Sequence, residues 1–363
     1  MVVLALIALN GATSTDIAGD PHYYVMRQGI YAGIGLLLMY GVSRVDYSRL
    51  RELRYPIYGL MLATIAAVLV ISRATRGAHS CIALPFFNFQ PSELGKVLLV
   101  VALAAFLVDR MRRMGRDTTA RIMLLGLIPT MFVMAEPDLG SALVYVAGTL
   151  ALLFVAGAPW KHFVALGTLI VLSITLVLVV APMGGVHLLK PYQVDRLTSF
   201  LHPSANPGDQ GYQQQQALIA MGSGEKTGRG VANATQTSLN FLPEHHTDFI
   251  FAVIGETFGF AGCALVLSLY ALLIWRGLHI LTVAKNLYGA LIAGGITVML
   301  LFQLFVNIGM NVGIMPITGV TAPLLSFGGS SMLATFLALG LLHSVHAQAR
   351  ETTELKGRAT VFQ

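Results

Sequence analysis

The 363-residue chain is poor in charge: 11% of its residues are Asp, Glu, Lys or Arg, while 55% are hydrophobic. Soluble domains carry roughly 25% charged residues, so a water-soluble globule is excluded because too much apolar surface would face water. Cysteine is scarce too, with Cys81 and Cys263 alone. We place these two cysteines at different depths, which argues against a disulfide.

Long uncharged runs are what the chain has in abundance. A helix of about 20 apolar residues is long enough to cross a bilayer, and such runs recur along the whole chain. We therefore predict an all-α, polytopic integral membrane protein that forms a single domain over residues 1–363. The ten expected transmembrane spans are residues 2–11, 29–43, 56–72, 94–108, 122–135, 138–158, 163–184, 249–275, 288–314 and 330–347.

The basic residues orient these spans. Fifteen of the 23 Lys and Arg residues fall in the inner segments if both termini are cytoplasmic, as the positive-inside rule expects. The net charge of +6 then reflects topology and does not indicate nucleic-acid binding. The start, "MVVLALIALNG", is too short for a full span and lacks a signal-peptide pattern, so we expect a first helix whose cytoplasmic end is cut back.

One large extracytoplasmic loop, about residues 185–248, interrupts the otherwise short connections. Loops of this length are usually functional or disordered; apolar stretches such as "QQALIAM" favour a folded loop lying partly in the membrane interface. Its "MGSGEKTGRG" (221–230) resembles a phosphate-binding loop, but Glu225 separates the Gly and Lys that the pattern needs side by side, and no strand precedes it. We expect the glycines to make tight turns.

Few ionisable residues lie within or next to the spans, and each is a functional candidate by default. "QPSELGKV" places Glu93 and Lys96 three residues apart on one helix face, as either a structural ion pair or the wall of a substrate cavity. Asp138 in "AEPDLGSALV" either caps a helix or joins that cavity. Arg196 in "YQVDRLTSFLHP" either meets lipid headgroups or grips phosphate.

"NFLPEHHTDFIFAVIGE" (240–256) crowds acids and histidines before an apolar helix. His245 and His246 are adjacent and tend to point apart, and the spacing of zinc or EF-hand ligands is absent. Thr247 or Asp248 could cap a helix starting at "FIFAV". Alternatively, Asp248 lies at the water–membrane boundary, where low-dielectric surroundings raise proton affinity and suit a general base.

The chain resembles the SEDS family of cell-wall polymerases, the RodA/FtsW/SpoVE group. The resemblance rests on "FQPSELGK", "EPDLGSAL", "YQVDRLTSFLHP", "GYQQQQALIAMGSG", "LNFLPEHHTDFIFAVIGETFGF" and "NIGMNVGIMPITGVTAPLLSFGGSS", spread through most of the chain in family order. "LNFLPE" and Thr318 in "PITG" make it most similar to RodA, the elongation polymerase. The family's ten-span layout agrees with the spans expected from hydropathy.

The resemblance implies an enzyme, a peptidoglycan glycosyltransferase that polymerises lipid II on the outer face of the bacterial plasma membrane, with inversion and loss of undecaprenyl pyrophosphate. It implies Asp248 as general base, Lys96 and Arg196 as charges for the pyrophosphate, and Glu93 and Asp138 as parts of the polar cavity. Ser330 in "SFGGSS" would let the last outer loop approach the substrate. The resemblance requires no protein-bound metal, but leaves room for a divalent cation, Mg²⁺ or Mn²⁺.

The implied partners are lipid II, the nascent glycan strand, a class B penicillin-binding transpeptidase and other membrane proteins of the elongation complex, with no nucleic acid. Two other functions stay open: a division-type, FtsW-like polymerase, and a lipid II flippase. A flippase predicts ionisable residues through the full bilayer depth, whereas here they gather at the outer helix ends.

Overall fold

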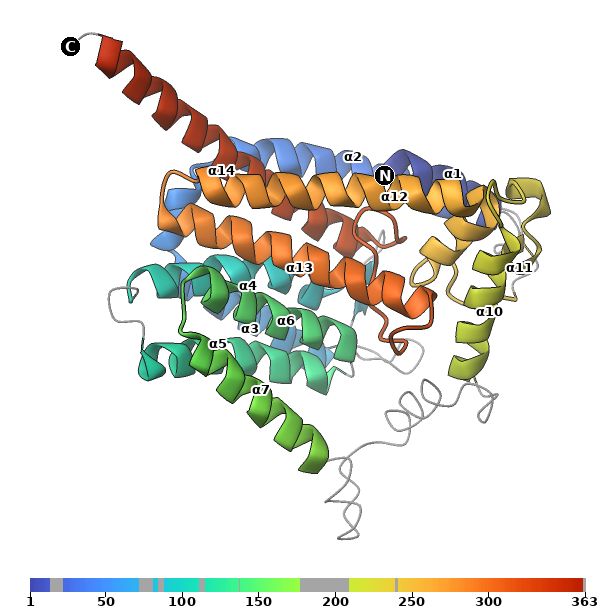
Figure 1. Ribbon diagram of the computed structural model, residues 1–363, viewed down its shortest axis with the longest axis horizontal. Helices are drawn as coiled ribbons and strands as arrows, with labels where there is room; N and C mark the ends of the chain where they lie inside the picture. The colour runs from blue at the N-terminus through green and yellow to red at the C-terminus, as the bar shows by residue number, and fades with distance from the viewer. Residues whose placement is uncertain are drawn as a thin grey trace.

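The protein is a bundle in which most of the long helices run along the longest dimension of the molecule, whereas α10 runs across it (Figure 1). The structure, a computed structural model, describes residues 1–13, 22–71, 81–83, 88–110, 115–136, 138–176, 209–238 and 241–361. The helices are α1 (Val2–Ala12), α2 (Tyr23–Ser43), η1 (Tyr47–Arg51), α3 (Arg54–Ile71), α4 (Pro91–Val108), α5 (Arg116–Ala135), α6 (Leu139–Val155), α7 (Trp160–Thr175), α10 (Asp209–Ser223), η4 (Val231–Asn233), α11 (Thr235–Ser238), α12 (Ile250–Val283), α13 (Leu287–Asn311) and α14 (Gly329–Val361).

The all-α membrane architecture expected from hydropathy is confirmed. Over the described residues each of the ten expected spans coincides with a helix, with the end of the span expected at 163–184 lying outside them. Within the described part of the chain, six helices are long and apolar enough to cross a membrane: α2, α4, α5, α12, α13 and α14. The helices α1, α3, α6 and α7 are apolar but shorter. One element was not expected: a two-stranded antiparallel hairpin, β1 (Ile82–Ala83) with β2 (Asn88–Phe89), which precedes α4.

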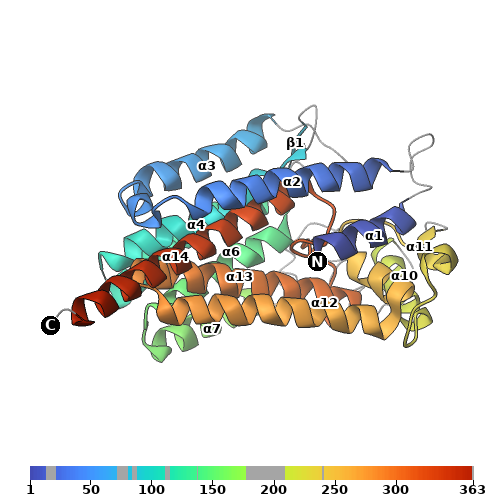
Figure 2. The ribbon, with the colours of Figure 1, turned by 90° about the horizontal axis from the view of Figure 1, so that it is seen from above.

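Helices α4 and α13 form the centre of the bundle, and Figure 2 shows α3, α2, α14 and α12 arranged around it. In the most apolar 18-residue stretch of each helix, 83% of the residues of α4 are buried, against 22% of those of α2. Helix α4 is therefore enclosed by protein, while α2 presents most of its surface outward. An apolar sequence alone cannot separate these two cases, because lipid and protein interior both accept apolar side chains.

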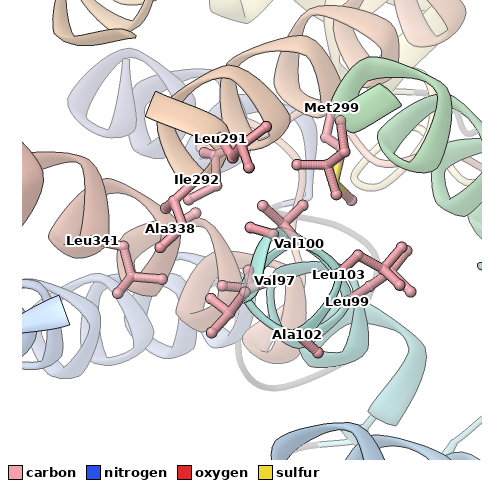
Figure 3. Close-up of a cluster of buried hydrophobic side chains, with 14 of the residues drawn as sticks. Val97, Leu99, Val100, Ala102, Leu103, Leu291, Ile292, Met299, Ala338 and Leu341 are labelled. Atoms are coloured by element: carbon pink, nitrogen blue, oxygen red, sulfur yellow. The ribbon is translucent and has the colours of Figure 1, made fainter. Parts of the chain in front are cut away.

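Side chains of α4, α13 and α14 interlock in the main core (Figure 3). Val100 of α4 lies toward α13, where a Cβ at Gly295 would come within 2.7 Å of its Cγ1. Gly148 of α6 is packed equally closely against the Met299 sulfur, at 2.7 Å from an added Cβ. Small residues let helix backbones approach and gain dispersion contacts, which is the main attraction between helices in lipid.

The described part of the large loop folds against the start of α12, on the right in Figure 1, where α10 and α11 lie. The buried Glu256 carboxylate of α12 accepts from the backbone N–H of Gln236 at 2.8 Å and of Thr237 at 3.1 Å, so it satisfies the amides at the start of α11. The expectation of a folded loop is confirmed for these residues.

The glycines of "MGSGEKTGRG" have a packing role. Helix α12 is interrupted at Gly259, whose φ of +65° is left-handed, and the loop backbone enters this break. The N–H of Phe260 donates to the Glu225 carbonyl at 2.9 Å. A Cβ at Gly224 or Gly228 would overlap the α12 backbone. The tight turns expected from the sequence thus pack on a helix break.

Candidate active site around Asp248

Asp248 lies on a tight turn directly before α12. The N–H groups of Thr247, Asp248 and Phe249 converge on the Glu244 carbonyl, at 3.1, 3.2 and 3.4 Å. Glu244 has a φ of +53°, which lets the chain reverse there. The N-cap of α12 is Phe249, so neither Thr247 nor Asp248 occupies the cap position that the sequence left open for them.

The backbone carbonyl of Asp248 is held by two amide side chains of α13. Asn307 Nδ2 donates to it at 3.0 Å and Asn311 Nδ2 at 3.1 Å, and both asparagines are fully buried. Each also has a further partner, because Asn307 Nδ2 donates to the Val320 carbonyl at 2.7 Å and Asn311 Oδ1 accepts from the Ala252 N–H at 3.0 Å. Buried amides with several partners hold a backbone firmly, since losing one bond leaves an unsatisfied polar group.

The segment between α13 and α14, loop 312–328, holds the preceding carbonyls of the same turn. Ser326 Oγ donates to the Thr247 carbonyl at 2.6 Å, and the Phe327 N–H donates to the His246 carbonyl at 2.9 Å. Gly319 of this loop has a φ of +74°, and a Cβ there would lie 3.7 Å from Asp248 Oδ2. The loop backbone therefore passes beside the carboxylate, which is half-buried.

Rings cover one side of the turn. The His246 ring lies 4.7 Å from that of Tyr24 and 5.9 Å from that of Phe327, measured between centroids. The neighbouring His245 is buried, and its Nδ1 lies 2.9 Å from the Leu242 carbonyl oxygen. The two histidine rings are 77° apart in orientation, as expected for adjacent residues. Both histidines therefore help to shape the turn.

Asp138 caps α6 and also reaches α4. Its Oδ1 accepts from the Ser141 N–H at 2.9 Å, while its Oδ2 accepts from Gln90 Nε2 at 2.9 Å and from Ser92 Oγ at 3.4 Å. Of the two explanations left open by the sequence, capping is present, and the second oxygen joins Asp138 to the start of α4.

Ser330, at the start of α14, joins the same group of polar residues. Its hydroxyl donates to the Asn88 carbonyl at 2.9 Å and accepts from the Gln90 N–H at 2.9 Å. In this conformation the hydroxyl thus connects α14 to the segment that precedes α4. The substrate contact implied for Ser330 stays a prediction.

Glu93 and Lys96 form an ion pair inside the bundle. Lys96 Nζ lies 2.7 Å from Glu93 Oε1, and both residues are buried. They line a cavity of about 30 Å³ between α4, α13 and α14, together with Gln303 and Thr335. A cavity of this size holds one or two water molecules, so it is too small for a sugar or a pyrophosphate as it stands.

Loop 312–328 connects the two acidic positions. It contacts the turn of Asp248 on one side, and at Gly140, near the start of α6, an added Cβ would lie 2.6 Å from the Thr318 carbonyl oxygen. The loop is also linked to α14, since the hydroxyls of Thr321 and Ser331 are 2.9 Å apart. Arg196 lies outside the residues that the structure describes, so its place relative to these groups stays a prediction.

Glu136 was missed as a candidate, although it stands in the "EPDLGSAL" motif. It follows α5 directly, is fully buried, and among the described residues neither of its carboxylate oxygens has a hydrogen-bond partner. Burial raises the pKa of Glu136 to about 8, and the nearby Asp138 carboxylate adds to the rise. The sequence gives no signal for this, because burial of a helix-end carboxyl depends on what packs over it.

The described part of the chain contains no preformed site for a resident metal ion. No three His, Cys, Asp or Glu side chains gather there into a group that could hold one. Glu93 already pairs with Lys96, and Asp138 accepts from Ser141 and Gln90.

Known proteins resemble this chain over nearly its whole length. A family model described as "Cell cycle protein", that of FtsW, RodA and SpoVE, matches residues 1–351. The chain belongs to the FtsW/RodA/SpoVE family. Within this family it is 36% identical to stage V sporulation protein E of Bacillus subtilis, over 91% of this chain and 89% of that protein. The peptidoglycan glycosyltransferase MrdB of Escherichia coli K12 is 33% identical, over 96% and 93%.

Other members of the FtsW/RodA/SpoVE family are about as similar. A probable peptidoglycan glycosyltransferase FtsW of Thioalkalivibrio sulfidiphilus is 37% identical, over 99% of this chain and 91% of that protein. Among solved structures, a chain described under "Structural coordination of polymerization and crosslinking by a peptidoglycan synthase complex" superposes with a TM-score of 0.80 at 36% identity, over 96% of each chain. RodA of Thermus thermophilus gives a TM-score of 0.66 at 33% identity, over 95% and 94%.

Proposed function

We propose that this chain is a peptidoglycan glycosyltransferase that polymerises lipid II, with Asp248 as the general base. In this reaction the base removes the proton of the 4-hydroxyl of an N-acetylglucosamine. The oxygen attacks the anomeric carbon of N-acetylmuramic acid with inversion, and undecaprenyl pyrophosphate leaves. Relatives that bear the name peptidoglycan glycosyltransferase and align over nearly the whole chain support the proposal.

The observation that carries the proposal is the way the Asp248 turn is held. Three consecutive backbone carbonyls, those of residues 246–248, accept hydrogen bonds from α13 or loop 312–328. A general base acts only within hydrogen-bond reach of the proton that it takes, so fixing its backbone favours catalysis. Gly319 places no side chain of its own beside Oδ2, where an added Cβ would lie 3.7 Å away.

Charge for the departing pyrophosphate would come from Lys96 and Arg196. Lys96 is the buried cation nearest to the polar ends of α4 and α6, but its cavity admits only one or two waters. On this proposal α4, α13 and α14 must separate before the pyrophosphate can reach Lys96, and Glu93 holds the ammonium in place until then. A divalent cation, Mg²⁺ or Mn²⁺, brought in with the substrate could share this task.

We further propose a role in cell elongation, because "LNFLPE" and Thr318 are RodA-like, and a class B penicillin-binding transpeptidase as partner. The solved peptidoglycan synthase complex supports the partner. We also propose the plasma membrane as the location, with cytoplasmic termini and an extracytoplasmic Asp248. The basic residues support this orientation, since the α2–α3, α4–α5 and α12–α13 connections, far from Asp248, carry Arg44, Arg110 and Lys285.

Polymerisation of fluorescent lipid II by the purified protein with its transpeptidase tests the proposal. Asp248→Asn keeps the shape of the side chain and removes its basicity. A positioned base contributes 10²–10⁴-fold, so glycan strands on a gel should decrease at least ~100-fold. Glu244→Gln is the matched control, because this carboxylate lies on the same turn, accepts from Thr247 Oγ1 at 3.2 Å and has no part in the proposed reaction.

Three outcomes would overturn the assignment. Polymer from Asp248→Asn at the wild-type rate removes Asp248 as the base. Transfer of lipid II across proteoliposomes without polymer from the wild-type protein favours a flippase. If Glu244→Gln loses as much activity as Asp248→Asn, the effect belongs to the turn and not to the carboxylate.

A further inference from the structure

A second and larger cavity lies at the end of the bundle away from Asp248. It has a volume of about 580 Å³ and is bounded by η1 and the start of α3, the end of α4 and the start of α13. Tyr288 lines it, whereas Asn307, which holds Asp248, comes 19 residues later in the same helix; at 1.5 Å per residue the two positions are about 30 Å apart. No part of the proposed reaction uses this cavity.

Two guanidinium groups on one carboxylate form its charged wall. Asp109 Oδ1 binds Arg51 Nη2 at 2.5 Å, and Asp109 Oδ2 binds Arg54 Nη1. The group carries one net positive charge. A guanidinium has five N–H donors, and Asp109 occupies a single nitrogen of each arginine, so most donors remain. Arg54 also lies over the rings of Tyr55 and Phe106, at 5.1 and 5.8 Å, which fixes its orientation.

The opposite wall is the first turn of α13, which supplies further donors. Asn286 Oδ1 accepts from the Gly289 N–H at 2.8 Å and from the Tyr47 hydroxyl at 3.2 Å, which leaves the Asn286 amide N–H₂ toward other partners. The backbone N–H groups of Leu287 and Tyr288 have no acceptor within α13, because they lie in its first turn, and both residues line the cavity. Donors thus face the cavity from both walls.

The remaining acid of the lining does not cancel this charge. Glu52 is exposed, so water and salt screen it. The side chain of Arg54 is 27% exposed and is screened less, whereas that of Arg51 is 46% exposed. Arg49 and Arg110 stand in the same connections and add positive charge. The site therefore suits an anion that can take several N–H donors at once, and phosphate is such an anion.

The apolar surface next to the cavity decides between a free phosphate and a lipid. Tyr55 is 66% exposed and Leu60, further along α3, is 58% exposed, in a helix that is expected to face lipid. Acyl chains would lie along this surface while the headgroup enters the cavity. A soluble phosphate would gain nothing from it.

We infer that this cavity binds the phosphate of an anionic phospholipid, of the phosphatidylglycerol type, in the leaflet away from Asp248. Arg51 and Arg54 grip the phosphate, Asp109 holds the two guanidinium groups in place, and the start of α13 donates from the other side. The inference does not depend on the proposed glycosyltransferase activity.

Native mass spectrometry of the detergent-purified full chain tests the inference with phosphatidylglycerol and phosphatidylcholine at equal concentrations. The wild-type protein should bind phosphatidylglycerol about tenfold more tightly, in line with ~1 kcal/mol per basic residue near a membrane surface. Arg51→Gln with Arg54→Gln should lose that preference and leave phosphatidylcholine binding unchanged. Arg49→Gln is the matched control, because it removes an arginine of the same turn that does not line the cavity.

Three results would overturn the inference: equal binding of both lipids by the wild-type protein, an equal loss in Arg49→Gln, or displacement of phosphatidylglycerol by glycerol phosphate at the same concentration. The last would mean that the acyl chains contribute nothing. If the double glutamine variant fails to fold, Arg51→Lys with Arg54→Lys keeps the charge but removes the forked donors, and it should still lose part of the preference.

Discussion

The buried carboxyl of Glu136 makes the stability of the bundle depend on pH. Both of its oxygens are buried without a partner among the described residues, and burial first, then Asp138, raises its pKa from 4.5 to about 8. Below pH 4.5 the folded and unfolded chains both hold the proton. Between pH 4.5 and 8 only the folded chain holds it, so stability present at low pH is lost as the pH rises, and is lost in full above pH 8.

The magnitude follows from the shift. Each pH unit in this window costs about 1.4 kcal/mol, so the total approaches about 5 kcal/mol over the full shift. Glu136→Gln has nearly the same shape and no titratable proton. The variant should match the wild-type protein near pH 4.5 and exceed its free energy of unfolding by about 3 kcal/mol at pH 7.

Denaturant unfolding in detergent micelles, followed by tryptophan fluorescence at pH 5, 6, 7 and 8, measures this difference. The wild-type value should fall relative to the Gln variant at each step. Asp138→Asn should keep most of the slope, because Asp138 is the smaller of the two causes. A difference between wild type and Glu136→Gln that is constant from pH 5 to 8 would refute the reasoning, since the carboxyl would then be ionised throughout or satisfied.

Three further predictions concern packing and pairing. Asn311→Leu removes one support of the Asp248 turn and leaves buried groups unsatisfied; we expect a loss of about 2–4 kcal/mol in unfolding free energy and, on the proposed function, at least ~10-fold less glycan product. Lys96→Met leaves the Glu93 charge buried without its partner and should lower the unfolding free energy by about 3–5 kcal/mol. The double variant Glu93→Gln with Lys96→Met should recover most of this loss, and additive losses would contradict the pairing. Gly228→Ala should cost more than ~1 kcal/mol, because its φ is +83° and a Cβ would overlap the α12 backbone, whereas Gly222→Ala meets nothing within 4 Å and should be neutral or slightly stabilising.

The sequence predicted the helices well because hydropathy and the positive-inside rule act locally. An apolar run of sufficient length has one stable conformation in lipid, where every backbone polar group must be satisfied within its own helix. The pairing of Glu93 with Lys96 was predictable for the same reason, since three residues in a helix place two side chains on one face. The sequence left Thr247 and Asp248 open as caps of α12, and the structure has Phe249 there instead, because helix ends depend on tertiary contacts.

The support of Asp248 could not be predicted from the sequence. Its carbonyl is bound by Asn307 and Asn311, 59 and 63 residues later, and an asparagine in an apolar span carries no sign of the atom that it will reach. The burial of Glu136 is equally non-local.

By itself, then, the sequence determined the membrane-spanning helical class, the approximate spans and the acidic positions at their ends. The tertiary structure alone decided which of those positions share a loop, which carboxyl is left unsatisfied, and where two arginines meet one aspartate at the far end. The physical reason is that hydrophobicity is a property of each segment, whereas hydrogen bonding and charge pairing in a bundle depend on which segments pack together.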